Sequence, residues 1–494
     1  NLVRTEKYAE EIIANYEQAQ GWYQQTPRLD KGLNDYVIIT LDSLTSAITP
    51  LVDWETSKGS NVQVVTTSWI DSNYNGYDLE EKMRNFLRDK YPSSEWGIEN
   101  VCLIGHYDDV PIRFTSQAET DYYYAELSLP DDQSWDANGN HVYGENYGDS
   151  NDFYGEVNVG RIPYSDVTTV SHICDKSVAY EQNNDDSFKK NILLLGSFFW
   201  SDTDNAVLME YKTNPSLHPW MSSWTKTRLY EQGHSSYPSD YDISYTNVEN
   251  VWSSGTYAFV NYAGHGSATA CFRMYPYSTE FVDINTCNSL NDDYPAIIFA
   301  AACSNHETEQ FNIGQAMMQQ GGVGFLGSTE VAYGYHGWND PYDGATASLD
   351  YFFTSHVTSG NYTQGQAHQW SLTHMYQNGL WYYNKLETFE WGALLGNPNL
   401  GMMPHSVNTE THITNISTDW NFVSLPFQTP AFSQPINKNQ LQIKTSGGIT
   451  TYDWATAVSL GLVSDFIFGW DRINQTYVFS NELKPGHGYW VYAY

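Results

Sequence analysis

Short, largely apolar runs recur along most of this chain and constrain its fold more than any other feature. They occupy residues 36–41, 62–67, 101–105, 191–196, 257–262, 296–301 and 322–326. Runs rich in Val, Ile and Leu are typical of strands that are buried on both faces, and helical patterns lie between them. The alternation predicts an α/β fold whose sheet is largely parallel and is flanked by helices.

The pattern divides the chain into four parts. We expect a helical segment at 1–29, two similar α/β subdomains at 30–185 and 186–403, and a β-rich accessory domain at 404–494. In the last part, Gly- and Pro-containing turns separate short runs rich in Val, Ile, Trp and Tyr. The length of 494 residues suits about three folding units.

The charge balance restricts the partners of the chain. Acidic residues outnumber basic ones by 58 to 23, for a formal net charge of −35. A polyanionic surface repels phosphate backbones, so nucleic acid is not an expected partner. Cations and basic peptides fit better, although the acidity also serves to keep an exported protein soluble. No apolar run is long enough to cross a bilayer and no signal peptide is visible at Asn1, so we expect no membrane span.

Two of the predicted strands lead directly into reactive side chains. The run at 257–262 continues into Ala-Gly-His265-Gly266-Ser, and the run at 296–301 continues into Ala-Cys303. In open parallel sheets, reactive groups gather past the carboxyl ends of the strands. A thiol beside an imidazole can split acyl compounds, and the amides of Gly266 and Cys303 would form an oxyanion hole. The same residues are also consistent with a buried turn histidine and an inert core cysteine.

The other cysteines carry less information. The chain has five, so at least one thiol is unpaired. Cys102 lies within an apolar run and is expected to be a buried free thiol. Cys271 and Cys287 flank the reactive region and are candidates for a disulfide, although sequence alone does not fix the pairing.

Around these residues the sequence resembles the gingipain family of caspase-fold cysteine peptidases. The resemblance rests on the Asn-Tyr-x-Gly-His-Gly-Ser turn at His265, the Ala-Cys at Cys303 and their spacing, with further matches at 159–163, 326–329 and 395–400. It covers roughly residues 30–403. It implies a caspase-like catalytic unit in a secreted or cell-surface endopeptidase that hydrolyses peptide bonds through a thioester. Cys303 would then be the nucleophile and His265 the general base and acid, without a catalytic cofactor.

The resemblance also indicates where a substrate would bind. The resemblance implies that the loop after the strand at 191–196 carries an acid that orients the histidine, and that the same loop supplies the acidic floor of an arginine pocket. Here Asp202, Asp204 and Glu210 follow that strand. We expect Asp204, with Asp202 beside it, to select Arg or Lys before the cut. Because 198–205 departs from the family pattern, solvated loop carboxylates remain an alternative.

Two tyrosines fall where the family places an aromatic pocket wall. Tyr333 and Tyr335 are therefore expected to line the pocket, with ordinary packing as the alternative.

A polar interval suggests a structural cation site. Asp136, Asn138 and Asn140 alternate around Gly139, and Glu145 follows. Alternating oxygen side chains around a glycine bind hard cations, and members of the resembled family bind calcium, so we expect a structural Ca²⁺ here; a solvated turn has the same composition. His306 and Glu307, close behind Cys303, lack the second ligand pair that a structural zinc site needs.

The expected partners are protein or peptide substrates, and the C-terminal domain is expected to associate the protein with a cell surface. The main alternative is a catalytically inactive relative that serves as a surface or binding protein. The presence of both His265 and Cys303 favours the enzyme, because a site that has lost its function is free to lose either residue.

Overall fold

The computed structural model describes residues 34–128, 135–403, 418–424, 436–438, 441–444, 451–471, 476–480, 482–483 and 488–494. The chain divides into two compact units, Asn1–Pro404 and His405–Tyr494. The helix expected near the N-terminus, within 1–29, lies outside the described residues. Within the described ranges, no helix has both the length and the apolar character needed to span a bilayer.

One eleven-stranded sheet forms the centre of the first unit. In spatial order its strands are β11 (Tyr241–Asp242), β10 (Thr225–Tyr230), β7 (Asn191–Gly196), β12 (Phe259–Ala263), β16 (Ala296–Ala301), β17 (Gly322–Gly327), β18 (Leu394–Gly396), β6 (Asn158–Ile162), β3 (Asn100–Ile104), β1 (Tyr36–Thr40) and β2 (Val62–Thr66). All neighbours are parallel except β17 and β18, which are antiparallel. The apolar runs of the sequence thus form one continuous sheet.

The short strand β18 connects the two halves of this sheet, because it pairs with β17 on one side and β6 on the other. Gly396 ends β18 with a φ of +109°, a conformation that favours glycine. A Cβ at this position would lie 2.4 Å from the carbonyl oxygen of Val323. The close approach of the two strands therefore requires glycine here.

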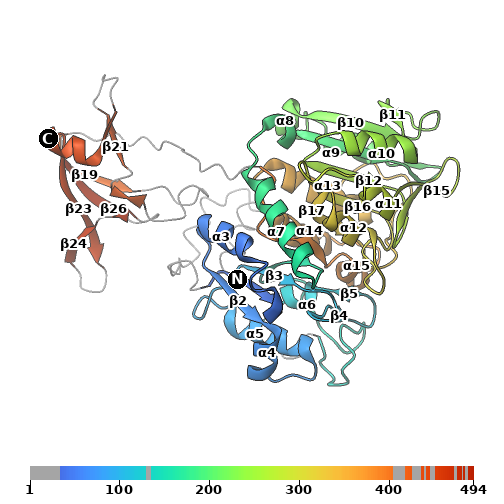
Figure 1. Ribbon diagram of the computed structural model, residues 1–494, viewed down its shortest axis with the longest axis horizontal. Coiled ribbons are helices and arrows are strands. Elements are labelled where there is room, and N and C mark those ends of the chain that lie inside the picture. The colour runs from blue at the N-terminus through green and yellow to red at the C-terminus, as the bar shows by residue number, and fades with distance from the viewer. Residues whose placement is uncertain are drawn as a thin grey trace. The chain divides into compact units, whose positions relative to one another are not determined.

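Helices cover both faces of the sheet (Figure 1). One face carries α4 (Thr67–Asn73), α5 (Leu79–Lys90), α6 (Tyr122–Ala125), α9 (Ala206–Lys212), α13 (Ala345–Ser359), α14 (Gln364–Gln377) and α15 (Asn384–Glu390). The other carries α3 (Thr49–Ser57), α7 (Val167–Gln182), α10 (Tyr245–Ser254), α11 (Ile284–Cys287) and α12 (Ile313–Gln319). The short helix α8 (Asp186–Lys189) precedes β7.

The alternation of side chains along each strand divides the core into two clusters. In β1, Val37 and Ile39 pack with Phe86 of α5 on one face. Tyr36 and Ile38 pack on the opposite face. Both faces of β1 are buried, which explains why this strand is apolar at nearly every position rather than at every second one.

Shorter strands surround the carboxyl ends of the central ones. β8 (Phe198–Trp200) and β9 (Thr203–Asp204) form a hairpin directly after β7. β13 (His265–Ser267), β14 (Ala270–Arg273) and β15 (Thr279–Asp283) form an antiparallel sheet after β12. β4 (Arg113–Phe114) pairs with β5 (Glu119–Thr120).

The second unit is β-rich with one described helix, α16 (Trp454–Ser459). Its main sheet contains, in order, β19 (Asp419–Ser424), β26 (Gly488–Ala493), β23 (Val463–Asp471) and β24 (Thr476–Ser480). Two smaller pairs are β20 (Ile436–Asn437) with β25 (Glu482–Leu483) and β21 (Gln442–Lys444) with β22 (Thr451–Asp453). Trp454, Ile467 and Val491 belong to a small core of their own.

Candidate active site

The fold brings His265 and Cys303 to neighbouring strand ends. β12 and β16 are adjacent and parallel, and Ala263 is paired with Ala301 at their carboxyl ends. His265 and Cys303 each follow this pair by two residues. Both side chains are half-buried. An imidazole and a thiol thus lie beyond the same edge of the sheet, where parallel α/β proteins place their reactive groups.

Cys303 differs from the other cysteines in its exposure. All five are free thiols; Cys303 is partly accessible, whereas the remaining four are buried. Cys271 and Cys287 therefore do not form the disulfide that their positions allowed. Burial raises the pKa of the Cys303 thiol, while the backbone groups of Ala332, Gly266 and Cys303 itself lower it. In the resting site the thiol form is favoured.

The backbone turns sharply immediately after the thiol. Ser304 has a φ of +54°, in the left-handed region that non-glycine residues rarely adopt. Its amide donates to the carbonyl of Glu330, in the segment that follows β17. This contact holds the turn in place, so Cys303 is presented at the edge of the sheet rather than inside it.

Gly266 packs directly against the backbone of Cys303. A Cβ on Gly266 would lie 2.3 Å from the Cys303 carbonyl oxygen and 2.8 Å from its nitrogen. No larger residue fits without moving one of the two strands. The backbone of Gly266 also lowers the pKa of the Cys303 thiol.

The His265 ring is held by a backbone carbonyl. Its Nε2 lies 2.8 Å from the carbonyl oxygen of Phe199 in β8. Because a carbonyl oxygen only accepts, Nε2 must carry the proton, which leaves Nδ1 of the neutral ring as the base. The Phe199 ring also packs edge-on against the imidazole, with ring centres 6.3 Å apart.

A sequence model of peptidase family C25 matches residues 30–403. The chain belongs to peptidase family C25. The predicted membership in a gingipain-type family and the predicted class, a cysteine-type peptidase, are thereby confirmed at the level of the family.

The curated relatives of this C25 family member are longer than the chain. It is 22% identical over 299 residues to gingipain R2 of Porphyromonas gingivalis, covering 60% of the chain and 35% of the relative. To gingipain R1 of the same organism it is 22% identical over 299 residues, covering 60% of the chain and 26% of the relative. The alignment spans only about a third or less of these relatives.

Solved structures of the family share the fold. The crystal structure of the Arg-specific cysteine proteinase gingipain R superposes with a TM-score of 0.59 at 17% identity, covering 95% of this chain and 93% of that one. The complex of the RgpB pro- and mature domains from P. gingivalis gives 0.58 at 16% identity, covering 93% of each chain. The predicted fold class, a mixed α/β caspase-like unit with a small β-rich C-terminal part, is confirmed.

In this C25 peptidase fold, the acids expected near His265 have other partners. Asp204 accepts from Ser235 Oγ at 2.7 Å and from the amide of Ala206 at 3.0 Å. Asp202 is exposed and pairs with His336, 2.9 Å away. Glu210 accepts from Arg228 and Tyr230. The histidine is thus oriented by the Phe199 carbonyl rather than by an acid of this loop.

Tyr333 and Tyr335 both pack against the ring of Tyr382. The Cys303 thiol contacts the carbonyl of Ala332, the residue before Tyr333, with a sulfur–oxygen distance of 3.6 Å. Tyr333 stacks on Tyr382 with ring centres 6.1 Å apart, and Tyr335 packs against the same ring at 5.4 Å. The two tyrosines therefore belong to one aromatic cluster beside the thiol.

The four residues of the expected calcium site come together in one loop. Asp136 Oδ1 and Asn138 Oδ1 both accept from the amide of Asn140, at 2.9 and 3.0 Å. Glu145 Oε2 accepts from the side-chain amides of Asn138 and Asn140. Among the described residues, however, no group of three or more His, Cys, Asp or Glu side chains is arranged to hold a metal ion.

A buried network, which sequence reasoning missed, supports the Cys303 turn. His306 is fully buried, its Nε2 lies 2.8 Å from the hydroxyl of Tyr107, and burial lowers its pKa to about 3. Arg161 lies over the Tyr107 ring and binds Asp121 through two hydrogen bonds of 2.8 and 2.7 Å. The only sequence signal was Arg161 itself, a charged residue within the apolar 159–163 match. His306 is thus a neutral structural residue.

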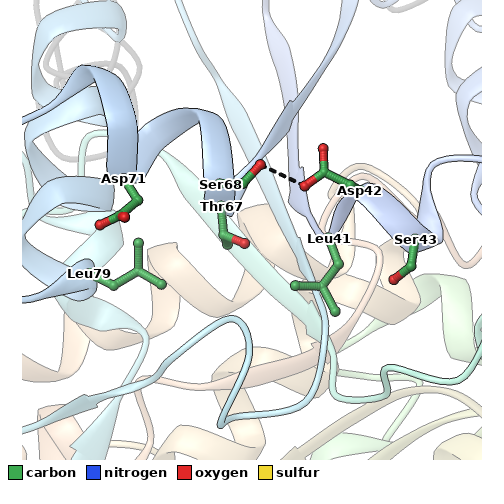
Figure 2. A pocket seen from close by; sticks show the side chains of 7 residues that line it. All are labelled: Leu41, Asp42, Ser43, Thr67, Ser68, Asp71 and Leu79. Atoms are coloured by element: carbon green, nitrogen blue, oxygen red, sulfur yellow. Dashed lines mark hydrogen bonds between the residues drawn. The ribbon is translucent and has the colours of Figure 1, made fainter.

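A hollow of about 470 Å³ lies apart from this site, at the carboxyl ends of β1 and β2. Figure 2 shows its lining, in which Ser68 Oγ donates to Asp42 at 2.6 Å. Four strands, β17, β18, β6 and β3, separate β1 from β16 in the sheet. The hollow is therefore no part of the candidate active site.

Proposed function

We propose that this chain is a cysteine endopeptidase in which Cys303 and His265 are the catalytic pair. The observation that carries the proposal is their position two residues past the paired ends of adjacent parallel strands. Membership in peptidase family C25 supports the reaction class. The alignment covers only 35% of gingipain R2, so the substrates of the whole relatives are carried over to this chain only as a proposal.

The first step forms a thioester. Cys303 Sγ attacks the carbonyl carbon of the scissile bond while its proton passes to His265 Nδ1. The Nε2–H of the resulting imidazolium keeps its hydrogen bond to the Phe199 carbonyl. The amides of Gly266 and Cys303 stabilise the oxyanion. The tetrahedral intermediate then collapses, and the amine leaves with the proton from His265.

The second step reverses these roles. His265 Nδ1 removes a proton from water, the hydroxide attacks the thioester, and the second intermediate releases the carboxylic acid. The proton returns to Cys303 Sγ. Because burial raises the pKa of the thiol, we expect proton transfer to accompany the attack on the carbonyl carbon rather than to precede it.

The proposed specificity is for Arg or Lys before the cut. Asp204 lies in β9, which pairs with β8, the strand whose Phe199 holds His265. A carboxylate recognises guanidinium through paired charged hydrogen bonds. Gingipain R, whose structure shares this fold, is described as Arg-specific. Asp202 beside it, and the wall formed by Tyr333 and Tyr335, complete the proposed pocket.

A panel of fluorogenic peptides with Arg, Lys, Asn, Asp or Leu before the cut tests this specificity. Cleavage of the Arg and Lys peptides, weakened in Asp204→Asn, is expected. Preferred cleavage of Leu or Asn peptides would refute the acidic pocket and leave the Cys303–His265 proposal standing. Absence of hydrolysis across the panel, together with no labelling of Cys303 by a peptidyl acyloxymethyl ketone, would favour the alternative of an inactive surface or binding protein.

Calcium is proposed as a structural ion, not as a catalyst. Asp136, Asn138, Asn140 and Glu145 lie in one hydrogen-bonded loop, and their side chains carry the carboxylate and amide oxygens that Ca²⁺ prefers. Added Ca²⁺ should raise the melting temperature of the EDTA-treated protein, and Asp136→Asn should abolish the rise. An unchanged melting temperature on addition of Ca²⁺ would contradict the proposed calcium site.

The proposed arrangement assigns catalysis to residues 186–403, support to 30–185 and surface attachment to 404–494. The proposed location is outside the cell or at its surface, with protein or peptide substrates. The net charge of −35 suits an exported protein. Cell fractionation tests the location, and deletion of 404–494 should release a surface-bound fraction without loss of peptidase activity.

A further inference from the structure

The strand that supplies the carbonyl for His265, β8, also binds a buried carboxylate, that of Glu231. This residue directly follows β10 and is fully buried. Glu231 Oε1 accepts from the amide of Phe198 at 3.2 Å and from the amide of Met274 at 2.8 Å. Its Oε2 accepts from the amide of Tyr275 at 2.9 Å. One carboxylate therefore binds three backbone N–H groups from two separate segments.

Both segments are linked to the histidine. Phe198 precedes Phe199, whose carbonyl accepts from His265 Nε2. Met274 and Tyr275 directly follow β14, in which Phe272 is the register partner of His265. Glu231 thus joins the strand that orients the imidazole to the hairpin that carries it.

Within the part of the chain that the structure describes, the Glu231 carboxylate forms no ion pair. Arg273, whose charge lowers the pKa of Glu231, binds Asp242 through two hydrogen bonds of 2.7 and 3.0 Å. A buried carboxylate is costly unless its oxygens are well satisfied. Here backbone amides satisfy them, so the group's contribution is to fix the backbone.

The same residue also reaches the proposed substrate pocket. The backbone carbonyl of Glu231 accepts from the amide of Ser235. Ser235 Oγ in turn donates to Asp204 at 2.7 Å. This link runs through the main chain of Glu231, so a change of its side chain leaves the Asp204 loop in place.

We propose that Glu231 is a positioning residue for His265, acting through the Phe198–Phe199 backbone. Among the described residues, His265 has no direct acidic partner and its ring nitrogen is held by the Phe199 carbonyl. The proposal rests on the proposed catalytic role of His265. Glu231 fixes the Phe199 carbonyl at the Nε2–H, which keeps the proton off Nδ1 and leaves that nitrogen ready to accept from the thiol.

Two conservative variants test the role. Glu231→Gln keeps the size of the side chain but places an NH₂ donor against a backbone N–H donor. Glu231→Asp keeps the charge but shortens the side chain by one methylene, which moves the carboxylate away from the amides. Both should lower kcat by about tenfold to a hundredfold, with KM within about twofold, because a small misplacement of a catalytic group is costly. Glu181→Gln is the matched control, since Glu181 is a buried carboxylate that binds Trp54, Lys58 and Gly401 away from this site.

A second readout does not depend on activity. In protein with ¹⁵N-labelled histidine, the His265 signal, assigned by its loss in His265→Ala, should show the Nε2–H tautomer. Glu231→Gln or Glu231→Asp should shift it towards a mixture of tautomers, while Glu181→Gln should not.

Wild-type kcat and an unchanged tautomer in a folded Glu231 variant would overturn the proposal. If the wild-type protein hydrolyses no peptide, the proposed function fails, and the tautomer measurement still decides the role of Glu231.

Discussion

Gly266 and Cys303 meet backbone to backbone at the point where the two halves of the candidate active site join. Any Cβ at position 266 would lie 2.3 Å from the carbonyl oxygen of Cys303. Both partners in this contact are backbone atoms, so no flexible side chain can move to relieve the clash. The contact therefore sets the spacing between the histidine hairpin and the cysteine turn.

Gly266→Ala should reduce kcat/KM by at least about a hundredfold, because separating the two segments misplaces both His265 and the oxyanion amides. Steady-state kinetics on an Arg or Lys peptide measures this. Gly401→Ala is the control, since a Cβ there would meet its neighbours only at ordinary distances of 3.5 and 3.6 Å. Equal activity of the two variants would contradict the contact's role.

Alkylation of the native protein should label Cys303 alone. The other four cysteines are buried, and burial raises the pKa of Cys102 to about 12. The pKa of the Cys303 thiol is raised as well. Because only the thiolate reacts, labelling by iodoacetamide should accelerate from neutral to alkaline pH. Peptide mass mapping reports the site, and equal labelling of Cys102 in folded protein would refute the expectation.

Most strands of the central sheet were predictable because burial on both faces makes them largely apolar, but the mostly polar and partly exposed β10 was not predictable. The strand β18 was not, since Leu394–Gly396 is too short to show a pattern and its place depends on pairing with β17 and β6. Proximity of His265 and Cys303 followed from strand ends that must share one edge of a parallel sheet.

The group that orients His265 was beyond the reach of sequence reasoning. It is the backbone carbonyl of Phe199, and every residue has a carbonyl, so no residue type marks it. Glu231 was equally hidden, because its partners are backbone amides of Phe198, Met274 and Tyr275. Only the fold shows which of many carboxylates faces them.

Asp121→Asn should lower the free energy of unfolding by about 3–5 kcal/mol, since it leaves Arg161 buried without an anionic partner. Both residues are almost fully buried, at 0% and 1% side-chain exposure. Urea denaturation measures the change. Asp71→Asn breaks the exposed pair with Lys82 and should cost less than about 1 kcal/mol. A similar cost for both variants would argue against the buried network.

Glu387→Gln should remove part of the pH dependence of stability. Burial raises the pKa of Glu387 to about 7. Between the unfolded pKa of about 4.5 and this folded pKa, the folded chain binds more protons than the unfolded chain. Its free energy of unfolding therefore falls as pH rises through this range, by up to about 3 kcal/mol.

The variant, which cannot ionise, should therefore gain stability relative to wild type as pH rises from about 5 to 8. Urea denaturation at several pH values measures the difference, with the exposed Glu280→Gln as a comparison. If the difference in the free energy of unfolding between wild type and Glu387→Gln stays constant with pH, the raised pKa of Glu387 in the folded protein is contradicted.

The central claim is that Cys303 is the nucleophile, and the most direct test is the kcat/KM of Cys303→Ala on the peptide that the wild-type protein cleaves best. The small substitution at a half-buried position should leave the melting temperature and near-UV circular dichroism unchanged. We predict a loss of at least about a thousandfold, because no other group in the site can form the thioester. Hydrolysis by Cys303→Ala at the wild-type rate would contradict the account.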